Sequence, residues 1–136
     1  MSKLDELLKL GVQQPESEQL LGVEFIEASE GKSTCKWLVS EKLRNGNGVT
    51  LGGYVTSAAD IGMAYAMLSV IEMNSSFTTL SINTTFHRPA LVGEIMIHSS
   101  IKRLGKTTAY VEAELFQNDK LIASATSTVM QFPVKE

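Results

Sequence analysis

Residues 52–72 read GGYVTSAADIGMAYAMLSVIE, and this stretch decides the architecture. Its aliphatic side chains and methionines are spread around the whole helical wheel, a pattern typical of a helix buried on nearly all sides. Asp60 lies near the centre of the stretch, where a charge costs roughly 2.5–3.5 kcal/mol in a membrane helix. The sequence therefore predicts one long helix in a globular core, and no membrane span.

On both sides of this helix the hydrophobic period changes to two, which is typical of strands. Turn-forming residues separate the strand-like runs, at positions 30–32, 104–106 and 118–119. The runs are residues 23–26, 35–39, 77–87, 94–103, 107–116 and 121–131. The first two runs predict a hairpin, and the other four predict strands that follow the helix.

The alternation in residues 77–87 assigns the side chains of this strand to two faces. The predicted sets are Leu80, Ile82, Thr84 and Phe86 on one face, and Thr79, Ser81, Asn83 and Thr85 on the other. The second set is polar throughout, so it is also compatible with a solvent-exposed face.

The predicted order of elements is a short helix, two strands, one long helix and four strands, which is an α+β arrangement. An antiparallel meander of about six strands can wrap its concave face around the single helix. Residues 1–20 form an N-terminal helical segment in this interpretation, and residues 21–136 form a single domain. Such a sheet leaves strand edges and one face uncovered, so we expect a homo-oligomer, either a dimer or a dimer of dimers.

The composition is that of an ordinary globular protein, with 136 residues, 43% of them hydrophobic, and a net charge of −3. Nucleic-acid binding needs a basic face, so the acidic balance argues against a nucleic-acid partner. Cys35 is the only cysteine and no Cys/His cluster has metal-ligand spacing, so neither a disulfide nor a metal site is predicted. Residues 1–10 lack the apolar core of a signal peptide, and we expect a reducing, cytoplasmic compartment.

A glycine-rich segment leads into the long helix, with glycines at positions 46, 48, 52 and 53. Unpaired backbone N–H groups at a helix N-terminus can hold an anion or an oxyanion, assisted by the helix dipole. Gly52 and Gly53 would let the carbonyl group of a ligand approach the backbone closely. A flexible loop with a glycine-rich N-cap is the structural alternative.

Asp60 is the only charged residue between Arg44 and Glu72, and no basic residue stands three or four positions away from it. A carboxylate on a buried helix is costly unless it is paired, hydrogen-bonded or functional. Asp60 is therefore a candidate general base or nucleophile. The alternative is a structural Asp that bonds Thr56 or the backbone of another subunit.

These residues carry a family resemblance. Asn45, the run Leu51-Gly52-Gly53 and Asp60, together with residues 79–89 and the turn at 103–106, resemble the hotdog-fold thioesterases. The similarity covers about residues 20–129 and is to the phenylacetyl-CoA thioesterase-like branch. It implies a hotdog fold and hydrolysis of an acyl-CoA thioester to free acid and thiol. It implies no separate cofactor, since CoA is part of the substrate.

In that family an Asn side chain and the N–H of the first glycine polarise the thioester carbonyl. An Asp from the other subunit attacks the carbonyl or activates water, and a Ser or Thr on the next strand positions that water. By motif these roles fall on Asn45, Gly52, Asp60 and Thr79. Acyl transfer needs such a set, namely oxyanion donors and a base or nucleophile about 3 Å from the carbonyl carbon.

Binding of the CoA moiety would draw on cations at strand ends and turns, where backbone amides are also free. Arg88, Arg103 and Lys106 meet that description, and Gly53 offers a backbone amide beside the predicted oxyanion site. Solvated turn charges are the alternative interpretation of the three cations.

Leu51 departs from the family pattern, which usually reads His-Gly-Gly. The missing imidazole removes a polar contact near the substrate carbonyl. Three outcomes follow: a slower thioesterase, a shifted range of substrates, or a non-catalytic acyl-CoA-binding or sensing protein. Asp60 has no evident purpose in the third case, so hydrolysis is the preferred prediction.

Overall fold

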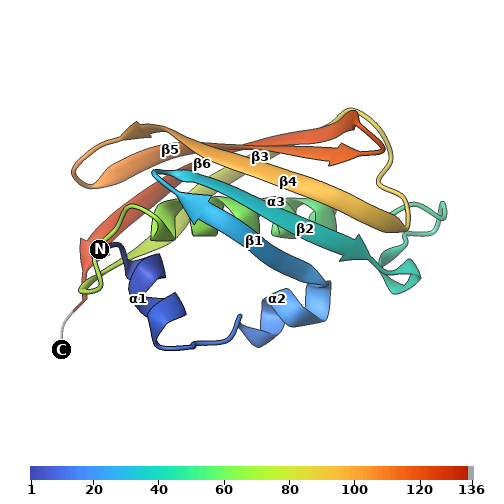
Figure 1. Ribbon diagram of the computed structural model, residues 1–136. Helices are drawn as coiled ribbons and strands as arrows, with labels where there is room; N and C mark the ends of the chain where they lie inside the picture. Colours follow the sequence, from blue (N-terminus) through green and yellow to red (C-terminus); the bar gives the residue numbers. More distant parts are fainter. Residues whose placement is uncertain (135–136) are drawn as a thin grey trace.

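A computed structural model describes residues 1–134 and shows a curved sheet wrapped around one long helix (Figure 1). The predicted helices and strands all form, with ends that differ by a few residues. The helices are α1 (Lys3–Lys9), α2 (Glu16–Leu21), the 3-10 turn η1 (Glu41–Leu43) and α3 (Gly52–Leu68). The strands are β1 (Val23–Ser29), β2 (Lys32–Val39), β3 (Ser75–Phe86), β4 (Gly93–Leu104), β5 (Thr108–Gln117) and β6 (Lys120–Pro133).

The six strands pair antiparallel in the order β1-β2-β4-β5-β6-β3, so the predicted α+β class and strand number are confirmed. The sheet is not the simple meander that the sequence suggested, because β2 pairs with β4 and β3 pairs with β6. Between β2 and β3 the chain runs along α3, whose 17 residues span about 25 Å of the concave face. Helix α3 therefore delivers β3 to the far edge of the sheet.

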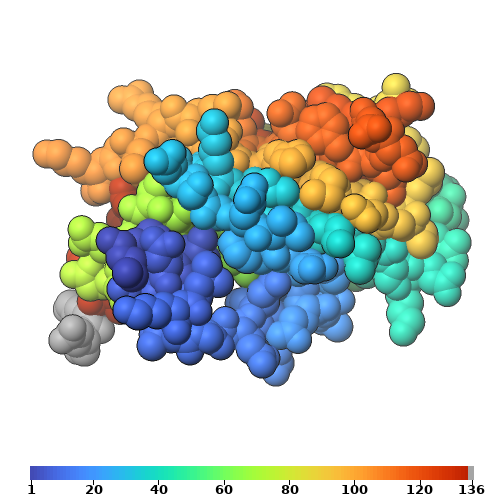
Figure 2. All heavy atoms as spheres, viewed as in Figure 1, coloured from blue at the N-terminus to red at the C-terminus, as the bar shows by residue number. Residues whose placement is uncertain are grey.

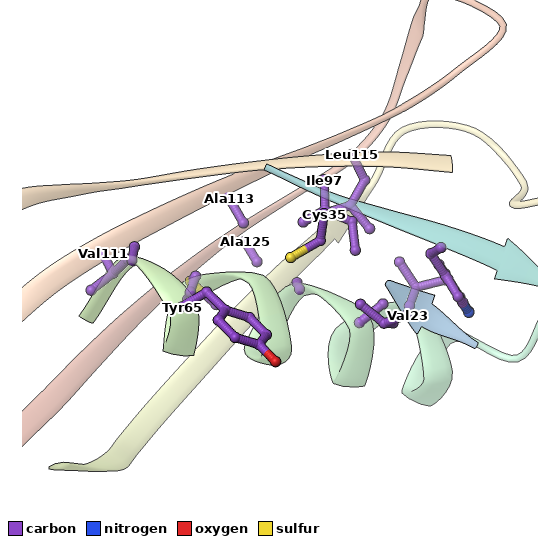
Figure 3. Close-up of a cluster of buried hydrophobic side chains, with 14 of the residues drawn as sticks. Val23, Cys35, Tyr65, Ile97, Val111, Ala113, Leu115 and Ala125 are labelled. Atoms are coloured by element: carbon purple, nitrogen blue, oxygen red, sulfur yellow. The ribbon is translucent and has the colours of Figure 1, made fainter. Parts of the chain in front are cut away.

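The core lies between the sheet and α3, and Figure 3 shows side chains from several strands meeting there. At Gly62 the helix lies tightly against β4 of the sheet. A Cβ atom on Gly62 would lie 2.7 Å from Ile97 Cγ2 and 2.8 Å from Ser99 Oγ. The Ser33 hydroxyl donates to the Gly62 carbonyl at 2.6 Å, so the helix and β2 are also joined by a buried hydrogen bond.

The prediction that α3 is buried on nearly all sides is wrong for the single chain. The sheet covers one side of α3, while Gly53, Tyr54, Ser57 and Asp60 are exposed on the other. The glycine and serine residues on the exposed side are few among many apolar residues. The sequence pattern therefore did not reveal that this side of the helix is exposed. The helix also ends at Leu68 rather than at residue 72.

A β-bulge in β3 reverses the predicted faces of Thr79 and Leu80, while the predicted alternation from Ser81 to Phe86 is confirmed. Thr79 pairs with Val129 and Ser81 pairs with Thr128, so Leu80 is an extra residue opposite one step of β6. The extra residue shifts the alternation by one position. Thr79 consequently lies on the side of β3 that faces α3, as Ile82 and Thr84 do. It does not share the face of Ser81.

The N-terminal segment lies on the side of the molecule away from strands β4 and β5 (Figures 1 and 2). Ser2 caps α1 through a capping box with Asp5, and the Lys3 N–H donates to the Ile71 carbonyl at 2.7 Å. Leu4 is buried in the core. None of the helices within residues 1–134 combines the length and apolarity that crossing a membrane requires.

Candidate active site

One row of residues on α3 lies directly against the inner face of β3. Thr79 Oγ1 donates a hydrogen bond to Asp60 Oδ1 at 3.1 Å. One helical turn earlier, Thr56 Oγ1 donates to Thr84 Oγ1 at 2.8 Å. The structure therefore brings together two residues, Asp60 and Thr79, that the sequence had placed in the same site.

Gly52 begins the same row, and its lack of a side chain allows it to lie close to β3. A Cβ atom at this position would lie 3.0 Å from Cζ of the Phe86 ring. Gly53 has open space around it instead, with no atom within 4 Å of the equivalent Cβ position. The first glycine thus permits a tight contact with the strand, and the second leaves the helix terminus uncovered.

The N-terminus of α3 presents donors without acceptors. Leu51 is the N-cap residue and makes no side-chain capping bond, and its side chain is 48% exposed. Within residues 1–134 the backbone N–H groups of Gly52 and Gly53 have no hydrogen-bond acceptor. Such free amides, aligned with the helix dipole, suit a carbonyl oxygen that becomes negative.

Asn45 contributes a third donor near this terminus. Its Oδ1 accepts the N–H groups of Asn47 at 2.8 Å and Val49 at 3.3 Å. Backbone N–H groups can only donate, so these two bonds define which side-chain atom is oxygen. The Nδ2 amide has no protein acceptor in the described part of the chain and is available to a ligand.

Asp60 and the amide donors are too far apart to act on one carbonyl within one chain. Gly52 and Asp60 are eight residues apart on α3, which corresponds to about 12 Å along the helix axis. Asp60 is exposed, and in the described residues no Lys or Arg forms a salt bridge with it. The expectation of a buried carboxylate is wrong for the isolated chain, because nothing within residues 1–134 buries the Asp60 side chain.

An open hollow of about 600 Å³ lies between α2, η1 and α3, and Asp60 lines it. We call it the α2–α3 hollow. Its lining residues are Ser17, Leu20, Leu21, Ser40, Lys42, Leu43, Tyr54, Ser57, Asp60 and Ile61. Most of its large side chains are apolar, and its volume falls within the range of small-molecule pockets.

The structure separates the cations that the sequence grouped as CoA-binding candidates. Arg88 follows β3, near the N-terminal end of α3, where the Thr50 N–H donates to the Ala90 carbonyl. Arg103 and Lys106 lie around the other end of β4, on the order of 30 Å away along the strand. Within one chain these residues cannot contact the same phosphate group.

Neither a metal site nor a reactive thiol is present in the described part of the chain. No three His, Cys, Asp or Glu side chains within residues 1–134 are grouped closely enough to hold a metal ion. Burial raises the pKa of the Cys35 thiol to about 12, and the charge of Glu18 adds to the shift. Cys35 is therefore a core residue and not a nucleophile at neutral pH.

Comparison with known proteins settles the family. A family model described as "Thioesterase superfamily" matches residues 47–123, from the loop before α3 into β6. The chain belongs to the thioesterase superfamily. The matched segment includes Gly52, Asp60 and Thr79.

This thioesterase-superfamily chain is 29% identical to acyl-coenzyme A thioesterase 13 of Mus musculus, over 92% of this chain and 91% of that protein. A phenylacetic acid degradation-related protein of Ralstonia eutropha JMP134 has a TM-score of 0.88 and 26% identity, covering 94% and 98% of the two chains. The PaaI protein of the E. coli phenylacetic acid degradation operon has a TM-score of 0.85 and 21% identity, covering 98% and 97%. The predicted hotdog fold and the predicted thioesterase superfamily are confirmed.

Sequence reasoning missed two parts of the site in this thioesterase-superfamily chain. Tyr54 and Ser57 lie six and three residues before Asp60 and line the hollow with it. Their helical spacing was a usable signal, but the assumption of an all-round buried helix concealed it. The contribution of α2 had no local signal, because it depends on how α2 packs against α3.

Proposed function

We propose that this chain hydrolyses an acyl-CoA thioester to a free acid and CoA. The observation that carries the proposal is the Thr79–Asp60 hydrogen bond at the edge of an apolar hollow. Uncapped amide donors at Asn45 and Gly52 supply the complementary half of an acyl-transfer site. The similarity to a mouse acyl-coenzyme A thioesterase supports the same substrate class.

The proposed mechanism divides the chemistry between these two halves. The thioester carbonyl oxygen accepts hydrogen bonds from the Gly52 N–H and the Asn45 Nδ2 group. Asp60 takes a proton from a water molecule, whose oxygen bonds to the carbonyl carbon. The C–S bond of the resulting tetrahedral species then breaks, and the CoA thiolate takes up the proton that Asp60 removed from the water. Direct attack by Asp60, followed by hydrolysis of the anhydride, is the variant that the same geometry allows.

Thr79 has a positioning role in this scheme. Its hydroxyl donates to one carboxylate oxygen of Asp60, which restricts rotation of the carboxylate. The other carboxylate oxygen is then available to the water or to the carbonyl carbon. Orientation of this kind contributes to catalysis because the reacting atoms must approach to about 3 Å.

We further propose that the active site is shared between two copies of the chain. A base and an oxyanion donor about 12 Å apart on one helix cannot serve one carbonyl, whereas Asp60 of one copy can face Gly52 of another. The free edge of β3 supports this assembly, since Leu80 and Phe86 on that strand are 55% and 53% exposed. Pairing of such an edge with a second copy would cover it.

Our proposal for the location of the CoA moiety rests on the separation of the cations. Arg88 lies at the end of the molecule that carries Gly52 and Gly53, so it is the candidate for a phosphate in the same site. Arg103 and Lys106 would have to come from another copy. The proposal includes a cytoplasmic location, because a single buried cysteine fits a reducing compartment.

The experiment is a CoA-release assay with acetyl, medium-chain, long-chain and phenylacetyl thioesters. Release that depends on Asp60 supports the proposal. The second candidate, an acyl-CoA-binding protein without turnover, is favoured by one observation, the apolar Leu51 beside the amide donors. Tight binding of every thioester with no CoA release from a folded protein would select that candidate.

A further inference from the structure

Helix α2 is too short to be stable by itself, so its position is a property of the tertiary structure. It has six residues, and Pro15 at its N-cap makes no side-chain capping bond. Isolated helices of this length do not persist in water. At its C-terminal end the Trp37 indole N–H donates to the Leu21 carbonyl at 3.0 Å, and the Leu38 N–H donates to the Gly22 carbonyl at 2.9 Å.

The middle of α2 is tied directly to α3. The Tyr65 hydroxyl donates to Glu18 Oε1 at 2.5 Å, and Gln14 Nε2 donates to the same oxygen at 2.8 Å. Gln14 is itself held by β1, since its Oε1 accepts the Phe25 N–H at 3.0 Å. The Tyr65 ring stacks on Phe25 with the centroids 4.6 Å apart. In Figure 3 the Tyr65 hydroxyl points away from the side chains around Ile97 and Cys35.

These anchors place an apolar face of α2 opposite α3 across the α2–α3 hollow. Leu20 and Leu21 lie on one side of the hollow, and Tyr54 and Ile61 on the other. Leu20 is 89% exposed, although leucine is an apolar residue on a helix that tertiary contacts hold in place. The hollow continues to Asp60, so a group whose carbonyl sits at Asp60 would extend between these side chains.

We propose that α2 is the acyl-binding wall of the site: Leu20, Leu21 and Ile61 hold the acyl chain, and the Glu18–Tyr65 hydrogen bond sets the distance of that wall from α3. The inference rests on the proposed function, because it takes the carbonyl carbon to lie at Asp60. It adds the substrate class, which is a thioester whose acyl group is an extended apolar chain. Leu20 is the specificity-determining residue, and Glu18 and Tyr65 are positioning residues.

Binding of non-hydrolysable S-alkyl-CoA thioethers of increasing chain length tests the wall without requiring turnover. In the wild type we expect each added methylene to tighten binding about three- to fourfold until the hollow is filled. Leu20→Trp narrows the hollow at an exposed position, so this gain should stop at a shorter chain. Leu10→Trp is the matched control, because Leu10 is also exposed and lies outside the hollow.

Tyr65→Phe tests the positioning role, because it keeps the stacked ring and removes only the hydroxyl. We expect weaker binding of long alkyl chains by about tenfold and unchanged binding of short ones, from the loss of one hydrogen bond to a charged group. In turnover, KM for long-chain thioesters should rise while kcat for acetyl-CoA stays the same. Glu18→Gln keeps an acceptor for both donors but removes the charge, so it should weaken the binding of long alkyl chains less than Tyr65→Phe does.

The outcomes separate this inference from the proposed function. If thioether binding depends on chain length as expected but no CoA is released, the hydrolase proposal is refuted and the acyl-binding wall is supported. CoA release with the same chain-length profile in the wild type and Leu20→Trp would remove the wall and leave the hydrolase. A change of oligomeric state in Leu20→Trp with an unaltered profile would show that a second copy covers the hollow, and would also overturn the inference.

Discussion

Thr79 donates a hydrogen bond to Asp60 because Leu80 is an extra residue in β3. Without the bulge, strict alternation would place Thr79 on the face that carries Ser81 and point its hydroxyl away from α3. Bulges are common beside active sites, where they redirect a side chain. The contact between the proposed base and its positioning residue is therefore a consequence of an irregularity in strand pairing.

Asp60→Asn should abolish most thioesterase turnover and leave the fold intact. The substitution is nearly isosteric at an exposed position, so unfolding free energy should change by less than about 0.5 kcal/mol. Loss of the base should lower kcat by about 10²- to 10⁴-fold. Asp119→Asn is the control, since Asp119 lies in the β5–β6 turn with φ 62°, a conformation that Asn adopts readily. Equal kcat values for Asp60→Asn and Asp119→Asn would show that Asp60 has only a structural role.

Thr79→Val should lower kcat about tenfold, while Thr79→Ser should retain most of the activity. Valine keeps the shape of threonine but cannot donate to Asp60, and a hydrogen bond to a carboxylate contributes about 1.5 kcal/mol, which corresponds to about tenfold in rate. KM should change little, because the carboxylate orientation matters mainly in the transition state. Thr85→Val, on the exposed outer face of the same strand, is the control for effects on β3 itself. Identical kinetics for Thr79→Val and the wild type would refute the positioning role.

Gly62→Ala should destabilise the protein by about 1–3 kcal/mol through overpacking. The new methyl group would overlap Ile97 and Ser99, and the buried interface leaves it no space. Gly53→Ala on the same helix is the matched control, since its Cβ meets nothing within 4 Å and alanine favours the helix. Urea unfolding curves measure both. A lower midpoint for Gly53→Ala than for Gly62→Ala would contradict the packing account.

Leu51→His should raise kcat with a smaller effect on KM. Removal of one oxyanion donor typically costs about 10²- to 10³-fold in turnover, so a restored polar contact can recover part of that loss. The gain would appear mainly as charge develops on the carbonyl oxygen. The half-exposed position of Leu51 should tolerate the imidazole, and thermal unfolding checks this. If both proteins are folded and bind acyl-CoA yet release no CoA, the binding-protein alternative is correct.

Two inactive variants should complement each other if the site is shared between copies. Asn45→Asp keeps the oxygen that accepts the loop N–H groups and removes the Nδ2 donor. In an equimolar mixture with Asp60→Asn, half of the dimers would be mixed, and each would hold one intact site. We expect about a quarter of wild-type activity after subunit exchange. Light scattering that shows a monomer, or a mixture as inactive as its components, would count against the shared site.

Local patterns in the sequence were sufficient for the elements of the fold. Helical spacing predicted α3, and a period of two with intervening glycine and Asn-Asp turns predicted the six strands, because these signals depend on neighbours along the chain. The motif of Asn45, Gly52 and Asp60 was also legible, since its spacing is preserved within one loop and one helix. Family membership followed from the same residues.

The tertiary structure alone decided how these elements and residues meet. Partners distant in the chain determine the position of β3 at the sheet edge, the bulge at Leu80 and the wall formed by α2. The sequence of each of these segments is by itself compatible with other pairings. The apolar sequence neighbours of Asp60 predicted a buried carboxylate. Asp60 is exposed, because the sheet covers only one side of α3. Exposure depends on what packs against a residue, and that is a property of the whole chain.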